Sequence, residues 1–297
     1  MSKKYLLIIF FLLPLFTGIW YFVLKNHDYS ISFKANQIPG EVYQKLLVYD
    51  YENLSKLKVT EQIPYNEIDQ TAKINDVGIH LNWHIKEEND SLSRVKVFVT
   101  QENKFQSRLQ MLTGKNEIQK IIAKEVERLK LALDLDREQY KVEITGTAIP
   151  PSATCACISL ENKIDHKAGD MMKNIGLLAS FFKENELEMA GKPRIQVNEW
   201  DLKTNGISYE FCFPFVPTKL INPPSNIYIK EFASQNSIHA IYNGNYMYSH
   251  LAWIRILNYA KKNDHEIINS PLEIFQENPE FGGDSRFWRA DIYMPLK

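Results

Sequence analysis

The sequence predicts an α+β fold, and three patterns along its 297 residues lead to this class. First, a run of apolar residues that carries no charge lies near the start of the chain. Second, strand-like alternation gives way to one long stretch with helical periodicity. Third, a strand–helix–strand–strand pattern occurs twice in the C-terminal half. A chain of this length has room for about two domains of ordinary size.

The composition excludes several classes of protein. Lys and Arg number 35 against 36 Asp and Glu, so the net charge is −1 and there is no basic excess for nucleic acid. The 24% of charged residues, with only 12 Gly and 13 Pro, is typical of globular proteins and excludes wholesale disorder and fibrous repeats. Three cysteines cannot form a disulfide framework. We therefore expect a well-packed, aromatic-rich protein that binds no nucleic acid.

The apolar run at residues 5–24 predicts a transmembrane helix. Twenty helical residues at about 1.5 Å each span about 30 Å, the thickness of the hydrocarbon core of a bilayer. No small-x-small cleavage site follows, which favours an uncleaved anchor over a signal peptide. Two lysines precede the run and one follows it, and this excess places the N-terminus in the cytoplasm. We expect a single-pass membrane protein with its anchor at residues 1–28, its lipid contacts at residues 5–24 and its remaining domains outside the cytoplasm.

Residues 29–136 predict a curved antiparallel sheet with one long helix laid across it. A short strand at 29–33 and a helical stretch from residue 41 come first. Residues 79–85 and 95–99 alternate between apolar and other side chains around a polar turn, so they predict an antiparallel hairpin. Apolar residues then recur at helical spacing, with charged residues on the opposite face: Ile122, Val126, Leu129 and Leu133.

Residues 137–297 contain an internal duplication. The segment SYEFCFPF at 208–215 parallels RADIYMPL at 289–296. A strand and an amphipathic helix precede each segment, and a further strand opens each copy, at 140–146 and 227–233. Two such β-α-β-β units predict a pseudo-two-fold domain with a cleft along their junction.

The second copy resembles the GyrI-like small-molecule-binding domain. The resemblance covers residues 140–297, and its motifs read Tyr242, Gly244, Tyr246, Glu273, Phe275, Trp288 and Pro295. In that family the domain is the effector-binding module of AraC- and MerR-type multidrug-responsive regulators, and it also occurs alone. No helix-turn-helix precedes it here, so the resemblance implies ligand binding without a role in transcription.

The region before the duplication is similar to a shortened SRPBCC domain, the START-related, helix-grip fold. The segment ISFKANQIPGEVYQKL, the predicted hairpin and the long helix carry this resemblance. KLKVTEQIPYNE stands where the family has a Trp-rich segment, a departure that puts a hydrophobic cavity in question. An anchor, a degenerate SRPBCC domain at 29–136 and a GyrI-like domain at 137–297 form an arrangement associated with bacterial membrane-anchored proteins.

Glu273 is the leading candidate for a functional residue. It lies between Leu272 and Ile274 on a predicted strand and therefore points away from these apolar neighbours. The aligned residue of the first copy is Ile195, so one carboxylate stands where pseudo-symmetry would place two. In an aromatic cleft this carboxylate would pair with a cationic ligand, or it would act as a general base in hydrolysis. The alternative is a solvated strand glutamate.

Aromatic side chains complete the predicted ligand site. Beside Glu273 we expect the ligand to contact Tyr246, Trp288, Tyr242, Phe275 and Tyr209. Most aromatic residues of this region have core packing as their alternative role, because Tyr209 shares one strand face with Phe211, Phe213 and Phe215.

Histidine and cysteine spacings predict no metal site and no cofactor. His80 and His84 lie about 13 Å apart on one strand face, too far for a single metal ion. Cys155 and Cys157 have no Cys-x-x-Cys spacing and are expected to be buried structural thiols. The sequence therefore favours a non-enzymatic, membrane-tethered module that binds an amphipathic small molecule, cationic ligands included. The alternatives are a hydrolase that uses Glu273 as its general base and a structural or interaction protein without a working pocket.

Overall fold

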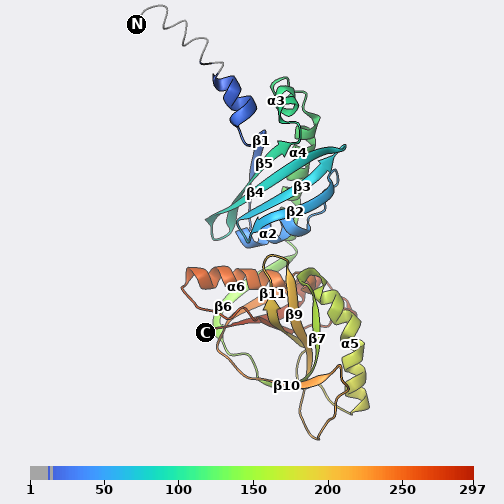
Figure 1. The fold of residues 1–297 in the computed structure, drawn as a ribbon. Helices are drawn as coiled ribbons and strands as arrows, with labels where there is room; N and C mark the ends of the chain where they lie inside the picture. Colours follow the sequence, from blue (N-terminus) through green and yellow to red (C-terminus); the bar gives the residue numbers. More distant parts are fainter. Residues whose placement is uncertain (1–12, 14–15) are drawn as a thin grey trace, which may run out of the picture. The chain divides into compact units, whose positions relative to one another are not determined.

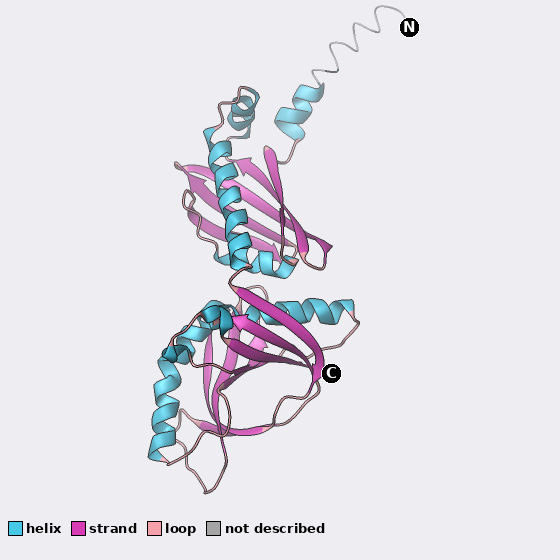
Figure 2. Ribbon diagram, turned by 180° about the vertical axis from the view of Figure 1, so that it is seen from behind, coloured by secondary structure: helices cyan, strands magenta, loops and turns pink. Residues whose placement is uncertain are grey.

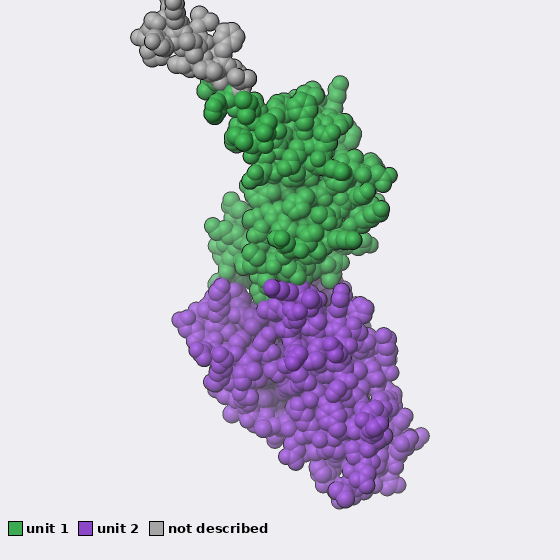
Figure 3. Space-filling model, viewed as in Figure 1, with its two compact units in different colours: residues 1–134 green, residues 135–297 purple. Residues whose placement is uncertain are grey.

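The computed structural model describes residue 13 and residues 16–297, and it shows an α+β protein with antiparallel sheets and a long helix (Figure 1). The chain divides into two compact units (Figure 3). Unit 1 extends to Asp134, and unit 2 comprises Leu135–Lys297. Each unit has its own sheet and its own helices, so each is described by itself.

Unit 1 is a five-stranded antiparallel sheet in the order β1-β5-β4-β3-β2. The predicted hairpin is confirmed as the pair β4 and β5, in which Trp83 lies opposite Val97. The predicted long helix is confirmed as α4, which lies across one face of the sheet (Figure 2). The elements are β1 (Tyr29–Ala35), α2 (Pro39–Val48), β2 (Ser55–Ile63), β3 (Glu67–Ile74), β4 (Val77–Asn89), β5 (Leu92–Gln101), α3 (Lys104–Leu112) and α4 (Glu117–Asp136).

The core of unit 1 lies between the sheet and α4. The predicted apolar face of β4 is buried, with Trp83 only 1% exposed. The apolar side chains of α4 at helical spacing pack in the same cluster, and Leu129 is fully buried. Burial of a side chain of this size stabilises a fold by about 1.5–3 kcal/mol. The buried positions of each element are therefore apolar, and their spacing along the sequence shows whether the element is a strand or a helix.

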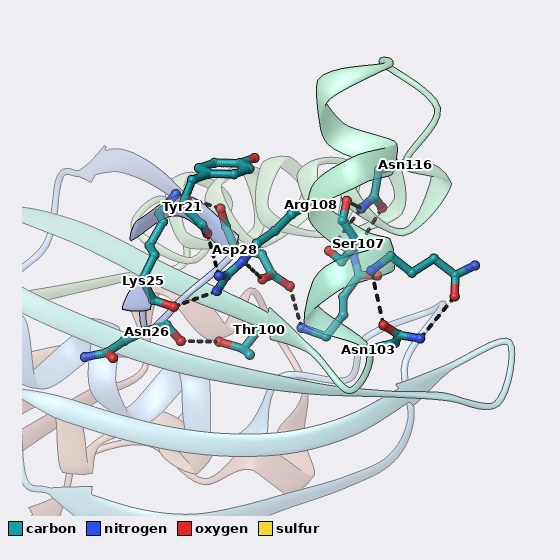
Figure 4. A network of polar contacts seen from close by, with 11 residues as sticks. Tyr21, Lys25, Asn26, Asp28, Thr100, Asn103, Ser107, Arg108 and Asn116 are labelled. Carbon is teal, nitrogen blue, oxygen red and sulfur yellow. Dashed lines mark hydrogen bonds and ion pairs between the residues drawn. The ribbon is translucent and has the colours of Figure 1, made fainter. Parts of the chain in front are cut away.

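Arg108 of α3 caps the helical segment at the start of unit 1 (Figure 4). This segment covers residues 16–24 and ends in a π-helical turn, η1 (Trp20–Leu24). The guanidinium is fully buried: its Nε donates to Asp28 Oδ1 at 2.9 Å, and its two Nη atoms donate to the carbonyls of Tyr21 and Lys25 at 2.6 Å. Carbonyls at a helix end have no partner within the helix, so Arg108 satisfies two groups that would otherwise lack one.

The prediction of a single-pass membrane protein is wrong. Across the residues that the structure describes, none of the helices combines the length and the apolar character needed to cross a bilayer. Residues 5–12, 14 and 15 of the expected span lie outside the described residues. Residues 16–24 are helical. The same finding leaves the predicted lipid contact without support.

Unit 2 is built on one strongly curved eight-stranded antiparallel sheet in the order β10-β7-β9-β8-β12-β13-β11-β6 (Figures 1 and 2). The main helices are α5 (Lys167–Glu184) and α6 (His250–Lys262), and the short ones are η2 (Ile164–His166), η3 (Tyr246–Tyr248), η4 (Pro279–Phe281) and η5 (Ser285–Phe287). The strands are β6 (Tyr140–Ala148), β7 (Ala153–Lys163), β8 (Arg194–Trp200), β9 (Gly206–Phe215), β10 (Tyr228–Phe232), β11 (Ser237–Gly244), β12 (Leu272–Phe275) and β13 (Arg289–Pro295).

The strand order of unit 2 follows the sequence duplication. The first copy supplies β7, α5, β8 and β9, and the second supplies β11, α6, β12 and β13. β8 pairs with β12 at the centre of the sheet, where the two copies meet. The leading strands change sides: β6 opens the first copy but pairs with β11 of the second, and β10 opens the second copy but pairs with β7 of the first.

A disulfide joins Cys157 to Cys212, so the expectation that Cys157 is a free thiol is wrong. The two residues lie directly opposite each other on β7 and β9, with their Cα atoms 4.1 Å apart. Cys155 is a buried free thiol, as expected. Burial raises the pKa of the Cys155 thiol to about 11.

Candidate functional site

A groove of about 920 Å³ lies in unit 2 on the side of the sheet that carries the helices. One wall is α5, and the opposite walls are η3 and the segment that runs from the end of β12 into η4. Side chains of β9 and residues before β8 close the remaining sides. The lining comes from α5, residues 189, 191–193, 211, 213, 245–247 and 275–280, and Trp288.

The lining is apolar and conformationally adaptable. Four of the seven methionines of the chain line the groove: Met171, Met172, Met189 and Met247. Three of them are solvent-exposed, at 43% for Met172, 44% for Met189 and 43% for Met247. Unbranched thioether side chains adjust to ligands of different shape, which is why methionine is frequent at surfaces that bind many partners.

The aromatic side of the groove centres on Tyr246 of η3. Its ring packs against Phe275, with the centroids 4.8 Å apart, and against Trp288 at 5.7 Å. Its hydroxyl donates to the carbonyl of Arg289 at 2.7 Å and lies 3.2 Å from Glu277 Oε2. Burial raises the pKa of Tyr246 above its ordinary value, so the hydroxyl stays protonated and holds the ring in place.

The side chains of α5 leave its backbone accessible from the groove because the residues that face the groove are small. Ala168, Gly169, Gly176 and Ala179 lie along this face. A Cβ atom added at Gly169 or at Gly176 would meet no atom within 4 Å. The space above the helix backbone is therefore open, and a ligand can approach this backbone closely.

A buried ion-pair cluster holds the walls together. Lys167 Nζ at the start of α5 lies 2.8 Å from both carboxylate oxygens of Glu273 on β12. It also donates to Ser249 Oγ at 2.6 Å, and Ser249 Oγ lies 3.0 Å from the same two oxygens. Lys167, Ser249 and Glu273 are all 0% exposed. One residue comes from α5, one from β12 and one from the turn between η3 and α6, so the cluster ties together the three segments that line the groove.

The cluster contains one lysine charge and one carboxylate charge. Burial lowers the pKa of Lys167, and the Glu273 carboxylate opposes this shift. The ammonium group also lies 4.7 Å from the ring centroid of Trp253. His250, the first residue of α6, is neutral because burial, and to a smaller extent the charge of Lys167, lowers its pKa to about 3. The first residues of the two duplicated helices thus differ in charge, and this difference breaks the pseudo-symmetry.

Three of the predicted ligand-binding residues line the groove: Tyr246, Phe275 and Trp288. Glu273, Tyr242 and Tyr209 are not among the lining residues and are at most 1% exposed. Glu273 lies opposite Ile195 and Ile292 in the centre of the sheet, where Lys167 covers it. It is therefore neither a solvated strand glutamate nor an open carboxylate.

The two other predicted tyrosines have structural partners. Tyr242 packs against Tyr140, with the ring centroids 6.2 Å apart, and donates to the carbonyl of Asn245 at 2.8 Å. The Tyr209 hydroxyl lies 3.4 Å from the carbonyl of Lys167. These contacts support η3 and the start of α5 from beneath the groove.

Sequence reasoning missed Lys167, Ser249 and the methionines. One signal for Lys167 was present, because a basic residue in the first turn of a helix opposes the helix dipole and needs a compensating partner. The methionines at 171, 172 and 247 lie on the two predicted helical segments, but their common groove depends on the pairing of the two copies. Neither feature has a fixed local spacing.

No family model and no curated protein matches the sequence. Among solved structures, the EcmrR C-terminal domain is 17% identical, with a TM-score of 0.44 over 53% of this chain and 98% of that chain. SAV2435 bound to tetraphenylphosphonium is 12% identical, with a TM-score of 0.35 over 54% and 94%. Both are GyrI-like effector-binding domains. A hydrolase from Listeria innocua is 10% identical, with a TM-score of 0.35 over 55% and 98%.

Similarities at these identities and TM-scores carry no argument about this chain. The SRPBCC resemblance of unit 1 finds no support among them.

Proposed function

We propose that unit 2 binds small amphipathic molecules in the groove beside α5. The observation that carries this proposal is the combination of volume and lining. About 920 Å³ is the size of a small-molecule site. Exposed methionines and a fixed aromatic cluster line it. A protein gains nothing in stability from leaving such side chains open to water, so their exposure in one hollow supports a binding role.

The charges at the groove favour a cationic or neutral head group over an anionic one. Glu277 and Glu280 are exposed among the lining residues, whereas Lys192 is the basic residue in this set. The Lys192 ammonium donates to the carbonyl of Gln276 at 2.6 Å. Beside Glu277, the rings of Tyr246 and Trp288 offer faces that attract cations. We therefore assign the predicted role of Glu273 to Glu277, whose side chain reaches solvent.

Neither alternative function gains support. A hydrolase that uses Glu273 would need water and substrate at this carboxylate, but both of its oxygens contact Lys167 and Ser249 in a fully buried cluster. A structural protein without a working pocket would not need the groove. The expectation that the chain binds no nucleic acid, no metal and no cofactor stays a prediction.

Binding of two ions of the same shape and opposite charge tests the proposal. Tetraphenylphosphonium and tetraphenylborate would be titrated into the full chain, with quenching of tryptophan fluorescence and thermal shift as readouts. We expect the cation to bind at least about tenfold more tightly, a difference of about 1.4 kcal/mol. Glu277→Gln should reduce this ratio without abolishing binding.

A matched pair of variants on α5 tests the location. Gly176→Leu fills the open space of the groove and should abolish binding of the cation without loss of stability, since leucine favours helix more than glycine. Ser180→Leu adds the same side chain on an exposed position of α5 outside the lining and should bind as the wild type does. Unchanged binding by Gly176→Leu would show that the groove is not the site, and absence of binding to either ion would refute the proposal.

A further inference from the structure

A second cluster of reactive side chains lies on the other face of the unit 2 sheet. It joins residues of three neighbouring strands, β6, β11 and β13. Thr145 Oγ1 lies 2.6 Å from His239 Nδ1, and His239 Nε2 lies 3.1 Å from Asp291 Oδ1. None of the three residues lines the groove. A hydroxyl, an imidazole and a carboxylate in this order are the elements of an activated nucleophile.

The hydrogen bonds of Asp291 fix the tautomer of His239. Arg289 Nη2 donates to Asp291 Oδ1 at 2.7 Å, and Gln276 Nε2 donates to Asp291 Oδ2 at 2.7 Å. Burial acts to raise the pKa of Asp291, but the hydrogen bonds from His239, Arg289 and Gln276 outweigh it and lower the pKa to about 2. Because the ionised carboxylate only accepts hydrogen bonds, His239 Nε2 donates to it. In the neutral imidazole His239 Nδ1 then presents its lone pair to Thr145 Oγ1, which lies 2.6 Å from it and 3.4 Å from the carbonyl oxygen of His239.

A β-bulge directs Thr145 toward this lone pair. In the register of β6 with β11, Gly146 lies opposite His239 and Ile144 lies opposite Ala240, so Thr145 is the extra residue. Gly146 has a φ of 105°, a conformation that glycine adopts readily. A bulge of this kind bends the strand and turns a side chain toward a new partner.

The base is enclosed while the hydroxyl is open. The His239 ring stacks on Tyr293, with the centroids 4.5 Å apart. The side chains of His239 and Asp291 are 12% and 9% exposed, whereas Thr145 is solvent-exposed on β6, an edge strand of the sheet. The base and the group that orients it are therefore held in place, and a small substrate can reach the hydroxyl.

We propose that Thr145 is a nucleophile that accepts acyl groups from small activated esters, with His239 as its general base and Asp291 as the residue that orients His239. His239 Nδ1 takes the hydroxyl proton as Thr145 Oγ1 bonds to the carbonyl carbon. The ester C–O bond breaks, and the imidazolium gives the proton to the leaving alkoxide. Water then attacks the acyl-threonine, its proton passes through His239 Nδ1 to Thr145 Oγ1, and the free acid leaves.

The test uses the full chain and p-nitrophenyl acetate as the acyl donor. Release of nitrophenolate gives the rate, and mass spectrometry of peptides locates the acetyl group. We expect the acetyl group on Thr145. Thr145→Val, which keeps the shape and removes the hydroxyl, and His239→Gln should each reduce the rate by about 10²–10⁴-fold, the usual contribution of a positioned base. Thr145→Ser should retain the reaction.

Thr147→Val is the matched control, because Thr147 is also exposed on β6 but lies opposite Ile238. It should react as the wild type does. An acetyl group found only on His239 or on lysines would overturn the proposal, and so would acetylation of Thr145 that His239→Gln leaves unchanged. Thermal unfolding of each variant checks its fold. If His239→Gln does not fold, the comparison of Thr145→Val with Thr145→Ser decides.

Discussion

Replacement of Lys167 by methionine should destabilise unit 2 more than any surface change on the same helix. The substitution keeps the length of the side chain but leaves the Glu273 carboxylate buried without its cation. Removal of one partner from a buried ion pair costs about 3–5 kcal/mol, because the remaining charge is left without compensation. Ser249 stays within 3.0 Å of the carboxylate, but a hydroxyl cannot neutralise it.

Lys173→Met is the matched control on α5. The Lys173 side chain is 75% exposed and lies 3.4 Å from Asp170 one turn away. An exposed pair of this kind contributes about 0–1 kcal/mol. We therefore expect Lys173→Met to change the free energy of unfolding by no more than about 1 kcal/mol, several times less than Lys167→Met.

A double-mutant cycle measures the pair itself. Urea unfolding of the full chain, followed by tryptophan fluorescence, would be compared for Lys167→Met, Glu273→Gln, the double variant and the wild type. We expect a coupling free energy of about 2–3 kcal/mol. Additive single effects, within about 0.5 kcal/mol, would refute the assignment of a charged pair.

Four further predictions concern stability. The pKa of Asp291 is about 2 in the folded protein, against an ordinary value of 3.8. The ionised carboxylate therefore stabilises the folded state above pH 3.8, and this stabilisation is lost as the pH falls from 3.8 to about 2. The wild type should therefore lose about 2 kcal/mol more than Asp291→Asn across this range in urea titrations. Gly244→Ala should destabilise unit 2 by about 1–3 kcal/mol in the same assay, because φ at this residue is 154° and the new Cβ would lie 2.7 Å from the Cβ of Tyr140. Cys157→Ala should cost about 2–5 kcal/mol relative to the oxidised wild type and nothing further on addition of a reductant, since it removes the disulfide. Arg108→Met should cost about 3–5 kcal/mol and should speed amide exchange in residues 16–24, whereas unchanged exchange would contradict the capping role.

Local periodicity was sufficient to predict the elements that bury one continuous face. The alternation at residues 79–85 predicted β4, because each buried side chain lies two residues from the next. The spacing of Ile122 to Leu133 predicted α4 for the equivalent reason in a helix. The duplication predicted two copies of one strand–helix–strand–strand unit. In each case the information lies within a short segment or in a direct comparison of two segments.

Pairings between distant residues could not be predicted in this way. Lys167 and Glu273 are separated by 106 positions, and the two halves of the disulfide by 55. Which residues come into contact across such separations in sequence depends on strand order and register. Neither can be predicted from the spacing of residues within one segment. Glu273 was singled out from a motif, but its burial depends on a lysine that the other copy supplies.

The apolar run at residues 5–24 illustrates a different limit. Hydropathy reports the composition of a segment, but it does not report where a helix ends or what its last carbonyls contact. In the structure Arg108, more than eighty positions along the chain, donates to the carbonyls of Tyr21 and Lys25. An arginine of α3 was not part of the pattern that suggested a membrane span.

The exchange of leading strands gives unit 2 the topology of two interlocked halves. β6 completes the sheet of the second copy, and β10 completes that of the first. A single copy on its own would therefore have an unpaired edge on its sheet, and its own leading strand would have no strand to pair with. Two identical copies would pair all of these strands if each added its leading strand to the sheet of the other, as in a domain-swapped homodimer. Unit 2 has the connectivity of such a dimer joined into one chain, so the two copies are free to carry different residues at the start of their helices, Lys167 in α5 and His250 in α6.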